Sequence, residues 1–224
     1  MAHLEHVFVS GIRFDSDVQY LVQGPHGLRY ENLPVCKSAS ALICALTSVI
    51  QCVAILGQAP RKRLLGRARR AAQRRLGMFE EGEIVRCVEA FGTAVAAQLH
   101  PSQGVDEIGR GARDALRSGH VCMLRFESNR SSRWATVIGV ELDRMTDSPR
   151  TLLLLDASAG EPWACGHNVR IELQGLAGRT VHASAGFTLS CRHLTGEACA
   201  VRLVRLVILR RRAPEPDSAV AIAS

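Results

Sequence analysis

The sequence predicts a single α+β domain, because helical patterns precede strand patterns along the chain. Apolar residues recur with the helical period in the first half, in three segments: residues 36–56, 80–91 and 105–117. Apolar runs typical of strands fill the second half, at residues 121–127, 134–142, 151–156, 169–173, 188–191 and 201–209. Two more strands are expected before the first helix, at residues 6–10 and 17–23.

The first helix and one of the strands are expected to be the most deeply buried elements. Residues 36–56 are apolar on nearly every side of the helix, which predicts that the rest of the domain surrounds it. Four leucines in a row, at residues 152–155, suit a strand that is covered on both faces.

Length and composition indicate a globular protein. The chain has 224 residues, of which 47% are hydrophobic and 22% charged. We expect one domain over residues 1–212 and a disordered tail over residues 213–224. The longest apolar stretch falls short of the roughly 20 residues that a membrane-spanning helix needs, so no transmembrane segment is expected. No secretory signal is visible at the N-terminus, and we predict a cytoplasmic protein.

The formal net charge of +7 is concentrated in one segment. Residues 61–75 hold eight basic residues and no acid, on a predicted helical insertion at about residues 60–76. One of its faces carries Arg63, Arg67, Arg70 and Arg74. This face is either simply solvated or a contact patch for an acidic partner or non-specific nucleic acid.

The eight cysteines do not form a recognisable metal or disulfide framework. There is no Cys-x-x-Cys pair, and we expect no cofactor and no metal. Two Cys-x-His pairs, Cys165/His167 and Cys191/His193, could together supply four zinc ligands, although this spacing is unusual for structural zinc.

Cys36 is the cysteine with the clearest chemical interest. It stands at the expected start of the first helix, where unpaired N–H groups and the helix dipole favour a thiolate. The alternative is that Cys36 is one more small, buried, apolar residue.

Three short motifs resemble those of a known family. Cys36-Lys-Ser-Ala-Ser-Ala-Leu opens a helix, Arg133-Trp-Ala-Thr-Val-Ile-Gly-Val begins a strand, and Leu-Leu-Leu-Leu-Asp156 ends the next one. Over residues 30–160, this order resembles the papain-like cysteine peptidases of the bacteriocin-processing type, which are double-glycine leader peptidase-like. The resemblance implies a papain-like fold, in which N-terminal helices including a buried central helix pack on a mostly antiparallel sheet.

The resemblance also implies a catalytic triad, in which Cys36 is the nucleophile and Asp156 orients the base. The position of the base, before Trp134, holds Arg133 instead of histidine. Arginine stays protonated at physiological pH and cannot accept the proton.

Other positions of the site also depart from the family pattern. Lys37, Ser38 and Ala157 replace residues that are usual in the family, and Tyr30 stands where a glutamine builds the oxyanion hole. Asn32 is the nearest substitute donor. Trp134 and Trp163 either line a peptide groove or are simply buried.

The predicted function is therefore that of a pseudoenzyme, a proteolytically inactive cysteine-peptidase homologue that binds a peptide or protein segment in its cleft. One alternative is an active peptidase or acyltransferase that uses Cys36 with a displaced base such as His120 or His167. Another is a basic binding protein that acts through residues 60–76.

Overall fold

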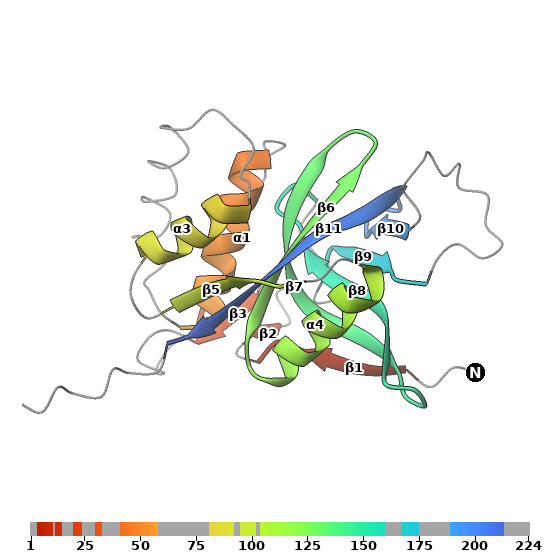
Figure 1. Cartoon of the computed structure of the whole chain (residues 1–224), viewed down its shortest axis with the longest axis horizontal. Helices are drawn as coiled ribbons and strands as arrows, with labels where there is room; N and C mark the ends of the chain where they lie inside the picture. The colour runs from red at the N-terminus through yellow and green to blue at the C-terminus, as the bar shows by residue number, and fades with distance from the viewer. Residues whose placement is uncertain are drawn as a thin grey trace, which may run out of the picture.

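The computed structural model describes residues 4–10, 12–14, 20–23, 30–32, 41–57, 81–91, 95–101, 104–159, 167–174 and 189–212. Within these ranges the chain forms eleven strands and three helices. The largest unit is an eight-stranded antiparallel sheet, six strands of which close into a barrel. Figure 1 shows this sheet curling around its own axis, with the helices outside it.

Six strands from the second half of the chain form the barrel. They are β6 (Val121–Ser128), β7 (Ser132–Asp143), β8 (Ser148–Leu155), β9 (Val169–Glu172), β10 (Leu189–His193) and β11 (Ala198–Arg211). The order around the ring is β7-β6-β11-β10-β9-β8, and the pairing of β8 with β7 closes it. Every neighbouring pair is antiparallel.

Two long strands bend to make this closure possible. The register of β7 shifts twice against β8, between Val137 and Gly139 and between Glu141 and Leu142. The end of β7 then also pairs with β1 (Leu4–Phe8). On β11 the register shifts near Leu203, and the end of the strand pairs with β5 (Val95–Leu99). Such bulges increase local bending and twist, which a small barrel requires.

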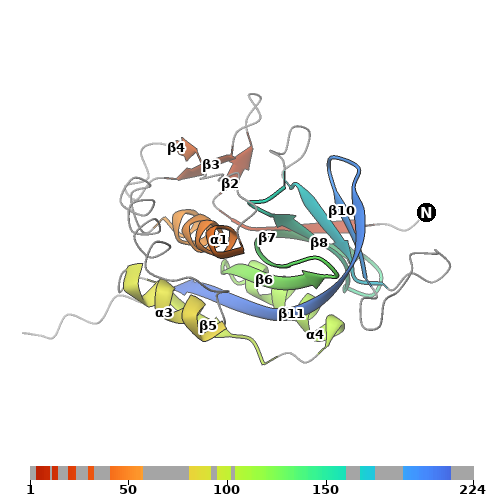
Figure 2. The same ribbon diagram turned by 90° about the horizontal axis from the view of Figure 1, so that it is seen from above.

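Two helices and a small sheet cover the outside of the barrel. The buried helix α1 (Ala41–Ile55) packs against β7 and β6, where Thr136 Oγ1 donates to Gln51 Oε1 at 2.7 Å. Helix α3 (Glu81–Phe91) packs on β5. Figure 2 shows the other side of α1 facing a three-stranded sheet. This sheet consists of β2 (Ile12–Phe14), β3 (Tyr20–Gln23) and β4 (Tyr30–Asn32).

Helix α4 (Val105–Arg117) packs across one end of the barrel, against β1, β6, β7, β8 and β11. Close packing there depends on Gly111, because a Cβ atom on this residue would lie 2.7 Å from His100 Nε2. The turn between β7 and β8 is tied to α4 by Asp147, which pairs with Arg117 at 2.7 Å and Arg113 at 3.1 Å. None of the described helices is both long and apolar enough to span a lipid bilayer.

The papain-like α+β fold expected from the sequence is therefore wrong. The described chain has a closed antiparallel barrel as its centre, and α1 lies against the outside of that barrel rather than forming the centre of the fold. The predicted helix at residues 105–117 matches α4, and all six strands of the second half are observed. Strands β2, β4 and β5 were not predicted. The basic segment at residues 60–76 and the tail at residues 213–224 lie outside the described residues.

Candidate functional site

The end of the barrel opposite α4 gathers the polar side chains of greatest chemical interest. Here β6 and β8 end, β7 begins, and the turn between β10 and β11 projects. We call this region the hairpin end, and it comprises Arg133, Asp156, Ser158, Asn168 and residues 189–199.

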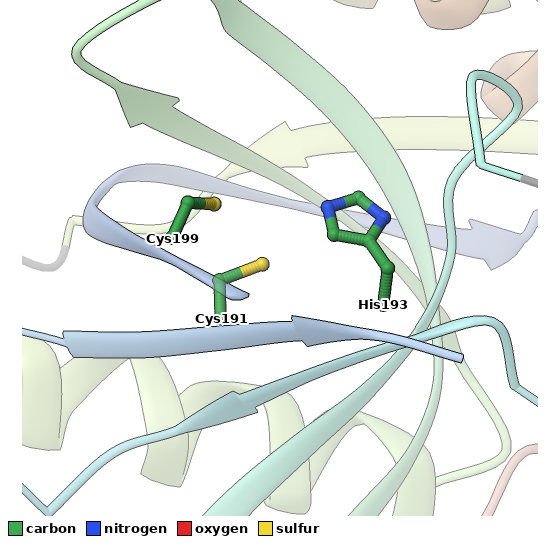
Figure 3. A group of neighbouring side chains, drawn as sticks. All are labelled: Cys191, His193 and Cys199. Atoms are coloured by element: carbon green, nitrogen blue, oxygen red, sulfur yellow. The ribbon is translucent and has the colours of Figure 1, made fainter. Parts of the chain in front are cut away.

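Three potential metal ligands lie on one face of the β10–β11 hairpin. Cys191 and His193 are two residues apart on β10 and therefore project from the same face. Cys199 on β11 is the direct antiparallel partner of Cys191, so it projects from that face as well. The Sγ atoms of both cysteines and a ring nitrogen of His193 all lie within 4.8 Å of one another. Figure 3 shows the two sulfur atoms and the imidazole facing a common space.

A tight turn holds the two strands of the hairpin in this register. The backbone N–H of His193 donates to the carbonyl of Glu197 at 2.9 Å, and Gly196 N–H donates to the His193 carbonyl at 3.0 Å. Gly196 has φ +90°, a conformation that residues with a side chain rarely adopt. Since the turn sets the register, it also sets Cys199 opposite Cys191.

The two thiols differ strongly in acidity. Cys199 is half-buried, and hydrogen bonds from Cys191 and His193 lower the pKa of its thiol. Cys191 is fully buried, and its hydrogen bond to Cys199 together with burial raises the pKa of its own thiol. The nearby positive charge of Arg133 lowers both pKa values. Cys199 is therefore the thiol of the pair that ionises first.

A buried ion pair stands next to these thiols. The Asp156 carboxylate, 0% exposed, accepts a hydrogen bond from Arg133 Nη1 at 3.3 Å. It also accepts bonds from the backbone N–H and the hydroxyl of Ser158, both at 2.8 Å. Arg133 Nη1 donates to Ser158 Oγ at 2.7 Å, and its Nε donates to Ser131 Oγ at 3.0 Å. These contacts hold the guanidinium in one position beside the cysteines.

Asn168 connects this ion pair to the hairpin. Its side-chain amide donates to the Asp156 carbonyl and accepts from the Asp156 N–H, both at 2.8 Å. The Asn168 carbonyl accepts a hydrogen bond from Leu194 N–H, in the hairpin turn, at 3.1 Å. The end of β8 and the hairpin are therefore fixed relative to each other.

The structure brings together only some of the residues that the sequence singled out. Arg133 and Asp156 are in contact, whereas Cys36 and Trp163 lie outside the described residues. Asn32 belongs to β4, and its side chain is not among those described. Trp134 is buried, with 4% of its surface exposed, and its carbonyl accepts a hydrogen bond from Ser48 of α1.

Of the two Cys-x-His pairs that the sequence singled out, only Cys191/His193 belongs to the three-residue cluster. Cys165 lies outside the described residues, and His167 lies near Arg170, Glu141 and His6 rather than in the three-ligand cluster. The third member of the cluster is Cys199, which sequence reasoning missed. Its signal in the sequence was Gly196, because a turn over residues 193–197, which this glycine favours, pairs residue 191 with residue 199.

The two histidines considered as displaced bases lie elsewhere. His120 lies just before β6, at the end of the barrel that α4 covers, and its backbone N–H donates to the carbonyl of Ala115 in that helix. His167 is half-buried, and desolvation together with the charge of Arg170 lowers its pKa.

Comparisons with known proteins assign no identity to this arrangement: no protein-family model matches the chain, and no curated protein matches its sequence.

Proposed function

We propose that the hairpin end binds one zinc ion through Cys191, His193 and Cys199. The observation that carries this proposal is the spacing of the three donor atoms, all within 4.8 Å of one another on one face of a rigid hairpin. Histidine and cysteine are the residues that zinc prefers in proteins.

The donor atoms fit the size of a zinc site. With Zn–S bonds of about 2.3 Å and a Zn–N bond of about 2.0 Å, tetrahedral geometry separates neighbouring donors by about 3.5–3.8 Å. The observed upper limit of 4.8 Å is about 1 Å longer, which side-chain rotation can supply. No movement of the β10–β11 backbone is required.

The charges and donor types also favour zinc. Two thiolates and a neutral imidazole balance a divalent ion, while the nearby charge of Arg133 is balanced by Asp156. Magnesium and calcium prefer oxygen ligands, which this cluster lacks among the described residues. Three protein ligands leave the fourth coordination position of the zinc ion for water, a substrate atom, or a residue outside the described ranges. A zinc ion with one such open position can activate a bound water or polarise a carbonyl group.

Metal binding is the first testable prediction. The purified protein should bind one equivalent of Zn²⁺, and Co²⁺ in its place should give tetrahedral visible bands with a thiolate charge-transfer band. Cys199→Ser should weaken binding about 100-fold or more, since even the loss of a group hydrogen-bonded to a ligand costs about 10- to 100-fold. Titration against a chromophoric chelator measures this affinity.

Cys87→Ser provides the matched control, because Cys87 is also half-buried but lies on α3. This variant should bind zinc like the unmodified protein. Loss of binding in both variants, or in neither, would contradict the assignment of the ligands. A chain that binds no zinc at micromolar concentration when fully reduced would end the proposal.

A second proposal comes from the sequence resemblance and concerns catalysis: we propose that the chain does not cleave peptides. The observation that favours it is the position of Arg133, a permanent cation whose Nη1 is occupied by Asp156 and Ser158. The fold expected from that resemblance is not the one observed, and the binding of a peptide or protein segment stays a prediction.

A peptide library incubated with the protein tests this second proposal. We expect no detectable cleavage, because loss of a general base typically costs about two to four orders of magnitude. Cys36→Ala should change nothing. Cleavage that disappears in this variant would instead show an active enzyme, with His120 and His167 as the first candidates for its base.

A further inference from the structure

Cys191 and Cys199 have a second chemical capability that does not require a metal. They face each other directly across the antiparallel pair of β10 and β11, on the same face of the hairpin. Their sulfur atoms lie within 4.8 Å of each other. Both are free thiols.

This arrangement is compatible with a disulfide. Directly opposed residues of an antiparallel pair have Cα atoms about 4.5–5.5 Å apart, and disulfides span Cα separations of about 4.4–6.8 Å. An S–S bond of about 2.05 Å therefore requires the two side chains to turn toward each other, with little change of backbone.

We propose that Cys191 and Cys199 are a reversible oxidation site, which a hydroperoxide converts into a cross-strand disulfide. The proposal goes beyond zinc binding and concerns the metal-free protein, so it stands whether or not zinc binds. Cys199 is the attacking residue because it is half-buried, while Cys191 is fully buried.

The reaction proceeds in two balanced steps. Cys199 Sγ attacks one oxygen of hydrogen peroxide, so that an S–O bond forms, the O–O bond breaks, and the leaving hydroxide takes up the thiol proton as water. Cys191 Sγ then attacks the sulfenic sulfur, the S–S bond forms, and the S–O bond breaks as a second water leaves with the Cys191 proton. Two thiols lose two electrons to one peroxide.

The molecule contains a comparison pair that should not react. Cys52 of α1 and Cys122 of β6 are also close, since Cys52 Sγ lies 3.8 Å from the Cys122 carbonyl oxygen. Both residues are 0% exposed, beneath the contact between α1 and the barrel. An oxidant in solution reaches Cys199 and does not reach this pair.

Oxidation would also have a consequence for the metal, and this consequence rests on the proposed function. A disulfide sulfur cannot act as a thiolate ligand, so zinc and the disulfide exclude each other. Bound zinc should protect Cys199 from peroxide, and oxidised protein should bind no zinc until it is reduced.

Peptide mapping tests the site directly in the full chain. Metal-free protein is treated with a small excess of hydrogen peroxide, unfolded in denaturant, alkylated and digested with trypsin. Cleavage after Arg192 places Cys191 in the peptide 180–192 and Cys199 in the peptide 193–202, each as its only cysteine. We expect these peptides to appear joined, with a mass about 2 Da below their sum, and to separate after reduction.

The comparison pair gives the internal control. Cys52 lies in peptide 38–61, which also holds Cys44, and Cys122 lies in peptide 118–125. These peptides should be recovered with their cysteines alkylated, and Cys52 and Cys122 should be oxidised at least about tenfold more slowly than Cys191 and Cys199. Cys191→Ser should leave a sulfenic acid on Cys199 that dimedone traps. Native protein in which Cys199 is oxidised to sulfinic acid without the joined peptide, or in which both pairs react equally, would overturn the proposal. Neither result bears on zinc binding by the reduced protein.

Discussion

Replacing Asp156 with alanine should lower the free energy of unfolding by about 3 kcal/mol, since removal of one partner from a buried ion pair typically costs about 3–5 kcal/mol. The lower end applies because Arg133 is 32% exposed and regains water when it loses its partner. Ser158 would also lose the acceptor for its N–H and its hydroxyl. Denaturant unfolding followed by circular dichroism measures the change.

Two further variants separate the ion pair from ordinary surface charge. Asp156→Asn keeps an acceptor for Ser158 while it removes the charge, so its effect should be about half as large. Arg202→Ala breaks an ion pair with Glu127 in which Arg202 is 55% exposed, and it should cost less than about 1 kcal/mol. Equal effects of Asp156→Ala and Arg202→Ala would show that the Asp156 network contributes little.

The positions of most strands and helices could be predicted because burial leaves a local pattern in the sequence. The four leucines at residues 152–155 predicted a strand covered on both faces, and all four are at most 2% exposed in β8. The short strands β2, β4 and β5 lack this signal. Strand β5 is partly exposed and owes its conformation to pairing with the end of β11.

The fold class could not be predicted because closure of the barrel depends on pairing between strands. A strand's sequence shows which faces are buried, but not which strand occupies each edge. The two register shifts in β7 allow this strand to pair with β6, β8 and β1. No residue type in the sequence predicts where such shifts occur. Burial of α1 was predicted correctly, but the same apolar pattern suits a helix outside a barrel.

Only part of the candidate site could be predicted from the sequence, again because the rest depends on strand pairing. The pair Cys191/His193 could be read from the sequence, because residues two apart on a strand share a face. Its third member, Cys199, lies eight residues away and joins the others only through the register of the hairpin. The contact between Arg133 and Asp156 depends similarly on the pairing of β7 with β8.

Leu154→Ala should be among the most destabilising single substitutions in the barrel, at about 2–5 kcal/mol, because it leaves a cavity in a close-packed core. Leu154 is 0% exposed, and the register places it between Val137 on β7 and Val169 on β9. Leu4→Ala, at an apolar position that is 45% exposed, should change stability by less than about 0.5 kcal/mol. Denaturant midpoints of both variants give the comparison.

A double-mutant cycle then tests the closure of the barrel itself. Leu154→Ala and Val137→Ala remove side chains that pair across β8 and β7, so their effects should deviate from additivity by about 0.5–3 kcal/mol. Leu154→Ala and Ile84→Ala should be additive, because Ile84 is a buried residue of helix α3, outside the ring of strands. An additive result for the first pair would mean that β7 and β8 do not close the barrel in solution. Coupling only in the first pair is expected, because side chains share a cavity only where the register brings them together.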